Sequence, residues 1–300
     1  MCKIHQVLTI CSFHFRRWKN NPRILVSFSL SFILCFLLTE KAVSFSIQEE
    51  TAMQLLEPFI WSFGDSYSIL LFSLLLLLLF SDMPFLNTSS PFYLYRTSRF
   101  VWLCGQLLYI GLSTLLYLTF TLLSTILLCI RNGFIGNMWS ETAAILGYSG
   151  MGQQVALPSL IKTLELSTPY QSSIHIFFLM LFYTLFLITL MMYLSIRKGY
   201  KCAILGIIIV SLFGLLLNRQ IFMTVFHLPT TMTYLANVIT GWISPLNHAT
   251  YHMHNFGYDL LPTLGNTYMF FSILISIFFY LSFRAIRQYN FSFIGTEKGA

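Results

Sequence analysis

Residues 174–196 read IHIFFLMLFYTLFLITLMMYLSI, and Arg197 and Lys198 follow directly. This stretch contains no Asp, Glu, Lys or Arg. About 20 apolar residues in a helix cross the hydrocarbon core of a bilayer. The stretch therefore predicts a membrane-spanning helix, and its two terminal basic residues mark the cytoplasmic end.

The composition extends this prediction to the whole chain. Of the 300 residues, 56% are hydrophobic and 9% are charged, and the mean hydropathy is +0.73. Soluble domains average about 25% charged residues, so bilayer lipid must be the solvent of this fold. We expect an all-α membrane protein forming a single domain over 1–300, without room for a separate soluble enzyme.

Five more apolar runs complete the prediction of about six transmembrane helices. Together with 174–196, they are 24–38, 60–80, 101–130, 202–217 and 268–283. A signal peptide is the competing interpretation of the first run, with Ala42-Val43-Ser44 as a weak cleavage site. The basic segment before it is unusually long and contains Pro22, which favours an uncleaved helix.

The basic residues orient the helices. If the N-terminus is inside, 13 of the 17 Lys and Arg residues lie in inside segments. The outside segments keep only Lys41, Arg131, Lys162 and Arg219. The positive-inside rule thus predicts that both termini are cytoplasmic. Because the basic residues flank apolar runs instead of forming one stripe, a nucleic-acid partner is not expected.

Two outside segments, 131–173 and 218–267, are long for simple connections. The second contains apolar pieces too short to span, interrupted by Pro229, Pro245 and Pro262. Such pieces are typical of a re-entrant segment, which requires protein or water around its backbone. An extracellular loop lying on the headgroups is the alternative.

The inside loop 81–100 reads SDMPFLNTSSPFYLYRTSRF. Ser89 or Ser90 can cap a short helix whose first turn accepts Pro91. That helix would present an aromatic and basic surface made by Phe92, Tyr93, Tyr95, Arg96 and Arg99. Such a surface either meets anionic headgroups or docks a cytoplasmic partner. The basic stretch 1–23 likewise predicts an interfacial helix along the inner leaflet, before a turn at Asn21-Pro22.

Catalytic and metal-binding patterns are weak. His248, His252 and His254 form HxxxHxH, but polar loop histidines are the favoured interpretation over a metal site. Thr114, Thr121 and Thr125 share one face of a predicted span, where packing is favoured over a substrate path. The six cysteines form no CxxC pair. No phosphate-binding P-loop occurs, so we expect no enzymatic activity, no cofactor and no metal.

Three segments together resemble the ABC-2-type permeases, the membrane subunits of ATP-binding-cassette exporters. The stretch FRRWKNNPRILVSF is similar to the family's elbow helix, and SDMPFLNTSSPFYLYRTSRFVWLCGQ lies where the family has its coupling helix. GWISPLNHATYH, before the last span, resembles its extracellular re-entrant region. The long outside segment 131–173 departs from the family pattern.

The resemblance implies a homo- or heterodimer of permease subunits, each coupled to a separate cytoplasmic ATPase. The matching coupling residues are Pro91, Phe92, Tyr93, Arg96 and Arg99. The function expected is export of a peptide or another amphipathic compound across a bacterial plasma membrane. The alternatives are a non-transporting anchor or signalling subunit of a complex and, less favoured, an intramembrane enzyme.

Overall fold

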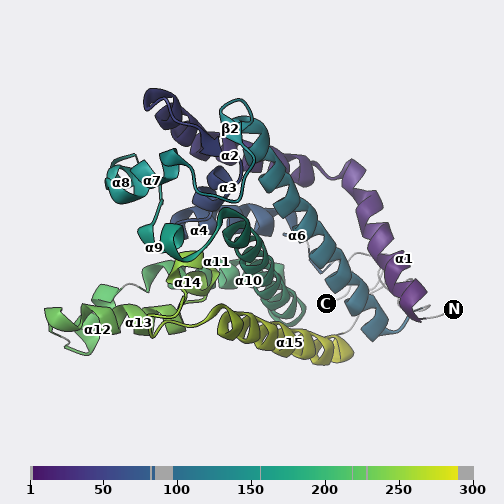
Figure 1. Cartoon of the computed structure of the whole chain (residues 1–300). Helices are drawn as coiled ribbons and strands as arrows, with labels where there is room; N and C mark the ends of the chain where they lie inside the picture. Colours follow the sequence, from purple (N-terminus) through teal and green to yellow (C-terminus); the bar gives the residue numbers. More distant parts are fainter. Residues whose placement is uncertain are drawn as a thin grey trace.

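The computed structural model is a bundle of helices (Figure 1). It describes residues 3–81, 83–84, 97–155, 157–217, 219–227 and 229–289. Within these ranges four helices are long and apolar enough to cross a membrane: α2 (Pro22–Gln48), α6 (Arg99–Cys129), α10 (Pro169–Lys198) and α15 (Leu264–Gln288). Two shorter apolar helices, α4 (Ser66–Leu79) and α11 (Tyr200–Leu216), occupy the remaining predicted spans.

The long helices begin at residues suited to capping. Asn21 accepts a hydrogen bond from the backbone of Arg23 and precedes Pro22, the first residue of α2. Thr168 and Pro169 begin α10 in the same way. A side-chain oxygen satisfies one of the free N–H groups of the first turn, and proline needs no donor there. These signals fix where each span begins.

The predicted span 60–80 is divided in the structure. A short helix, α3 (Glu57–Ser62), ends before Gly64, and α4 begins after Asp65. The carboxylate of Asp65 accepts a hydrogen bond of 2.8 Å from the backbone of Ser68. Asp65 thus caps a new helix inside the apolar run, and α4 alone is only about 21 Å long.

Helices α2 and α6 run in the same direction, with α4 antiparallel to them. The ring of Phe28 contacts those of Tyr117 and Phe120, while Ser31 lies 3.4 Å from Thr121. The hydroxyl of Ser27 donates to a carbonyl of α4, that of Leu75, over 2.8 Å. The chain therefore returns through α4 before α6 begins.

Helices α10 and α15 also run in the same direction. His175 near the start of α10 lies 3.1 Å from the Tyr268 hydroxyl near the start of α15. Further along, the ring of Tyr193 contacts that of Phe278. Helix α11 lies between them in the sequence and runs in the opposite direction. Its Gly206 packs against Leu194 of α10.

The N-terminal helix α1 (Lys3–Arg16), followed by η1 (Arg17–Asn20), lies beside the first part of α6 (Figure 1). Gly105 of α6 permits this approach, because a Cβ atom there would lie 2.6 Å from a methyl carbon of Ile10. The expected N-terminal helix is therefore present, and it packs against a long helix of the same chain.

The two long segments that the sequence predicts to lie outside contain short elements. In 131–173 these are β2 (Gly133–Phe134), α7 (Glu141–Tyr148), α8 (Met151–Gln154) and α9 (Ile161–Leu166). In 218–267 they are α12 (Arg219–Val225), η2 (Thr230–Met232), α13 (Thr233–Ile243), α14 (Pro245–Ala249) and η3 (Tyr251–Met253). Strand β1 (Met53–Gln54) pairs in parallel with β2. Helices α12 and α13 project away from the side that carries α1 (Figure 1).

A stripe of small residues on α2 forms its contact face. Ser27, Ser31, Cys35 and Thr39 recur every four residues and are all buried. Small side chains allow close approach of helix backbones in membranes, where packing and hydrogen bonds replace the hydrophobic effect between helices. On other faces of α2, Leu25, Ile33 and Leu37 are exposed, as lipid-facing residues are.

Candidate functional site

The predicted coupling surface lies mostly outside the described residues. Pro91, Phe92, Tyr93 and Arg96 fall in that part, whereas Arg99 is described as the first residue of α6. Both ends of the inside loop 81–100 are also described. The contacts that attach this loop to the helices are therefore defined at both ends.

Arg99 binds the end of the last long helix. Its guanidinium donates hydrogen bonds to the carbonyls of Ile286, at 2.8 Å, and Arg287, at 2.6 Å. The last carbonyls of a helix have no partner within that helix and carry partial negative charge. Arg99 therefore caps the C-terminal end of α15 and joins it to the start of α6.

Aromatic rings extend this attachment. Phe100 contacts Phe283 edge to face, with ring centres 5.3 Å apart, and also contacts Phe279. The guanidinium of Arg287 lies 4.5 Å from the centre of the Phe283 ring, within the range of a cation–π interaction. The C-terminal end of loop 81–100 is thus packed on α15 as well as hydrogen-bonded to it.

The N-terminal end of the loop is attached to a different helix. Arg23, in the first turn of α2, donates a hydrogen bond of 3.1 Å to the hydroxyl of Ser81. The loop therefore connects to α2 at one end and to α15 at the other. A displacement of this loop would act on both helices.

Polar contacts hold α1 beside this attachment. The indole of Trp18 donates to the Tyr109 hydroxyl over 2.8 Å, and the Gln106 amide lies 2.9 Å from Nε2 of His14. Burial, and then the positive charge of Arg17, lower the pKa of His14 to about 4. His14 is therefore neutral at pH 7, and its Nε2 accepts the hydrogen of the amide.

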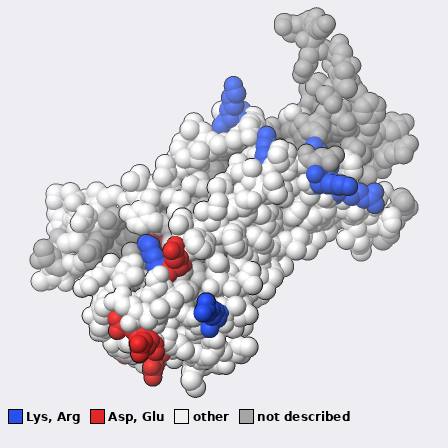
Figure 2. All heavy atoms as spheres, turned by 90° about the horizontal axis from the view of Figure 1, so that it is seen from above, with Lys and Arg blue, Asp and Glu red and all other residues white. Residues whose placement is uncertain are grey.

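Charge is distributed unequally over the molecule. Figure 2 shows Asp and Glu toward one end of the visible face, while several Lys and Arg gather toward the other end, beside the region that is not described. Lys or Arg residues also lie beside the acidic residues in this view.

The threonines of the predicted substrate path are buried in the bundle. Thr114, Thr121 and Thr125 are inaccessible, as is Tyr117 beside them. Thr121 donates to the carbonyl of Tyr117 within its own helix. These side chains contribute to packing between α6 and its neighbours and do not line an open path in this conformation.

A buried carboxylate joins the segment that follows α2 to the segment that follows α6. Glu57 accepts hydrogen bonds from the backbone of Gln54, at 3.1 Å, and from the backbone and hydroxyl of Ser140, at 2.8 and 2.6 Å. Burial raises the pKa of Glu57 to about 7, although the three donors act in the opposite direction. The arrangement connects the start of α3 to the start of α7.

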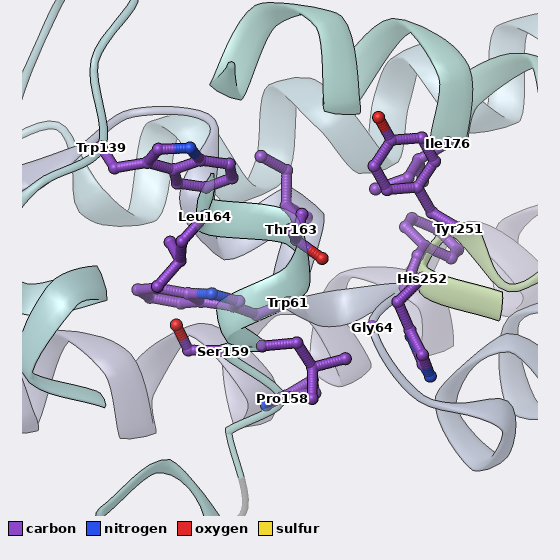
Figure 3. Close-up of a pocket in the computed structure, with 13 residues that line it drawn as sticks. Trp61, Gly64, Trp139, Pro158, Ser159, Thr163, Leu164, Ile176, Tyr251 and His252 are labelled. Carbon is purple, nitrogen blue, oxygen red and sulfur yellow. The ribbon is translucent and has the colours of Figure 1, made fainter. Parts of the chain in front are cut away.

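A small cavity lies beneath this outer part (Figure 3). Trp61, Trp139 and Tyr251 contribute to its walls, and its volume is about 20 Å³. A cavity of that size accommodates about one water molecule, so it excludes any organic substrate. His252 lies at its edge, where burial and the nearby ammonium of Lys162 lower the pKa of the imidazole to about 4.

A larger apolar groove lies between α6 and α10. Its volume is about 440 Å³, and Leu122, Ile126, Phe177 and Phe178 form much of its wall. Gln54, Tyr170 and Ser173 contribute the polar part. The lining of this groove is almost entirely apolar.

The three loop histidines are not gathered around a metal-binding position. Within the part of the chain that the structure describes, no group of three His, Cys, Asp or Glu side chains could hold a metal ion. His248 and His254 are buried and both contact the hydroxyl of Thr267. They are therefore internal groups, in contrast to the polar loop residues expected from the sequence.

The sequence did not predict the capping role of Arg99, the pairing of Glu57 with Ser140 or the stripe of small residues on α2. The internal role of Arg99 and the pairing of Glu57 with Ser140 each join residues more than 80 positions apart. No local pattern reports such contacts. The stripe of small residues on α2, in contrast, was readable from its spacing of four.

Together the four long apolar helices define a multi-pass helical membrane protein. Comparison with protein-family models, with curated proteins and with solved structures finds no match.

Proposed function

We propose that this chain is the membrane-spanning permease subunit of an ATP-driven exporter, with a separate cytoplasmic ATPase as its motor. The observation that carries the proposal is the attachment of loop 81–100. Arg23 connects its beginning to α2, and Arg99 connects its end to α15. A partner that pushes or pulls this loop would move two membrane helices at once.

The proposal includes six membrane passages with both termini inside. Helices α2 and α6 run in the same direction, so the intervening α3 and α4 must return the chain across the membrane. The parallel pair α10 and α15 requires the same of α11. Although α4 and α11 are short, this alternation supports a passage for each.

In this proposal the ATPase docks on the middle of the loop, which lies outside the described residues. Pro91, Phe92, Tyr93 and Arg96 are the proposed contacts. Arg99 has an internal role as well, because its guanidinium caps α15. The ATPase would act on α15 through Arg99 and Phe100, and a second permease subunit would complete the translocation path.

The proposed substrate is a peptide or another amphipathic compound. The apolar groove between α6 and α10, with Tyr170 in its lining, supports this class. No residue in the described ranges is proposed to perform catalysis.

Purification of the chain from its native membrane tests the partner. We expect a P-loop ATPase to purify with the wild-type chain and to be lost from Arg96→Glu. Arg197→Glu is the matched control, because it reverses an exposed charge at the inner end of α10 and should retain the ATPase. Arg99 is left unchanged, since its loss would also disturb α15.

Full recovery of the ATPase with Arg96→Glu would contradict the docking site. Absence of any P-loop ATPase from the wild-type preparation would contradict the exporter and favour a membrane anchor.

A further inference from the structure

Two buried histidines meet at one threonine where the last outside segment joins α15. His248 belongs to α14, His254 follows η3, and Thr267 lies in the first turn of α15. All three are almost inaccessible to solvent. Nδ1 of His248 lies 2.8 Å from the Thr267 hydroxyl oxygen, and Nε2 of His254 lies 2.9 Å from the same oxygen.

The other nitrogen of each ring faces a backbone carbonyl. Nε2 of His248 lies 3.1 Å from the carbonyl oxygen of Trp242. Nδ1 of His254 lies 3.0 Å from that of Tyr251. A carbonyl oxygen only accepts, so each of these nitrogens carries a hydrogen. Rotating either ring by half a turn would replace both nitrogen contacts with carbon, so the ring orientations are fixed.

When both rings are neutral, the three side chains do not have enough hydrogens to form all of these hydrogen bonds. A neutral imidazole has one N–H, and in each ring it already points to a carbonyl. The nitrogens facing Thr267 are then both acceptors, and the hydroxyl has a single hydrogen to donate. One buried ring nitrogen is left without a partner, which is unfavourable.

One additional proton removes the conflict. A protonated His254 donates to Tyr251 and to the Thr267 oxygen, while the Thr267 hydrogen points to His248. The mirror arrangement, with the charge on His248, forms the same four hydrogen bonds. We propose that His248, Thr267 and His254 form a buried binding site for one proton that the two imidazoles share.

Uptake and sharing of the proton make and break only bonds to hydrogen. A proton from solvent forms an N–H bond with the free lone pair of one ring nitrogen, and the site gains one positive charge. Transfer to the other ring breaks that N–H bond, forms a new bond to the Thr267 oxygen, and passes the former hydroxyl hydrogen to the second ring. No other reactant is needed.

A second proton is unfavourable, because two charged imidazoles would then repel each other across one hydroxyl. From η3, His252 and Tyr251 face the pair, and α10 contributes His175, which stacks on Tyr251. The Lys162–Asp259 ion pair and Asp65 lie beyond, near His252. Burial lowers the pKa of His254 to about 4 and lowers that of His248, while hydrogen bonds to the carbonyls raise both. Uptake therefore falls between about pH 4 and the ordinary histidine value of about 6.5.

This site is independent of the proposed exporter function. It places a positive charge, acquired on acidification, between the last outside segment and the beginning of α15. Because Thr267 belongs to α15 and both histidines belong to the preceding segment, proton uptake strengthens the connection between them.

Nitrogen-15 NMR of the full-length protein labelled on histidine tests the proposal between pH 7.5 and 4. His248→Phe and His254→Phe assign the two sets of ring signals. In the wild type, we expect both sets to shift with one common midpoint and to account together for one proton. Thr267→Val keeps the shape but removes the shared hydroxyl, and should lower the affinity for that proton at least tenfold.

Thr250→Val is the matched control, because Thr250 is equally buried and its hydroxyl donates to the carbonyl of Leu246, while its backbone, which His254 contacts, is kept. It should keep the common midpoint, as should Thr267→Ser, which restores the hydroxyl. Separate midpoints in the wild type, no proton uptake above pH 4, or an unchanged titration in Thr267→Val would each overturn the proposal. If Thr267→Val does not fold, the wild-type titration decides.

Discussion

Replacing Glu57 with Gln should weaken the connection between the start of α3 and the start of α7. The carboxylate accepts from two backbone N–H groups, those of Gln54 and Ser140, and from the Ser140 hydroxyl. An amide offers one oxygen in place of two, and its NH2 group must then face an N–H. At least one buried backbone donor loses its partner.

The magnitude follows from that orphaned donor. Leaving a buried N–H unsatisfied costs about 1–3 kcal/mol, which corresponds to about a 5- to 150-fold larger population of the locally open state. Because burial raises the pKa of Glu57 to about 7, the native state binds a proton that the unfolded state releases above its ordinary pKa of about 4.3. The Glu57 contribution to stability therefore decreases as pH rises between these values. The loss of stability caused by Glu57→Gln should be larger at pH 5 than at pH 8.

Hydrogen exchange followed by mass spectrometry measures this opening at the Ser140 amide and along α7. The control is Glu49→Gln, which makes the same chemical change at a carboxylate near the end of α2, outside the Glu57 network. Unchanged exchange in Glu57→Gln, or a penalty that grows from pH 5 to pH 8, would refute this account of the carboxylate.

Three further predictions concern the inner end. Gly105→Leu should displace α1 at a cost of about 1–3 kcal/mol, and the amide hydrogens of α1 should then exchange faster. Gly111→Leu is the control: no atom lies within 4 Å of its added Cβ, so α1 should stay protected from exchange. Arg99→Ala should speed hydrogen exchange in the last turn of α15. Arg284→Ala, which removes an exposed arginine from the same helix, should not. Equal exchange rates in the two variants would contradict the capping role of Arg99. The native structure lowers the pKa of His14 to about 4, so protonation of this imidazole is unfavourable in the native state. The amides of α1 should therefore lose protection from exchange as pH falls from about 6.5 toward 4. In His14→Gln, the protection of α1 should not change over that interval.

Much of the fold was predictable because apolar length and capping residues are local properties. The run 174–196 became α10, and Asn21-Pro22 began α2 as expected. The break before α4 was not predicted, since the leucine-rich run concealed the capping role of Asp65. Helix α2 also continues to Gln48, ten residues past the predicted end of the first span at residue 38.

The candidate site was less predictable, because it depends on contacts across the chain. A basic residue at a predicted docking surface and one that caps a distant helix look alike in sequence, and Arg99 is the example. The pattern of histidines suggested at most a metal, whereas Thr267 decides what His248 and His254 do. Only the fold brings that hydroxyl between them.

The alternation of six helices is the central claim, and the locations of two junctions test it most directly. Fusions that end after residue 98 and after residue 217, carrying either alkaline phosphatase or a fluorescent protein, report the side of the membrane reached after α4 and after α11. We predict a cytoplasmic reporter after residue 98 and an external reporter after residue 217. An external reporter after 98, or a cytoplasmic one after 217, would contradict six passages and remove loop 81–100 from the reach of a cytoplasmic ATPase.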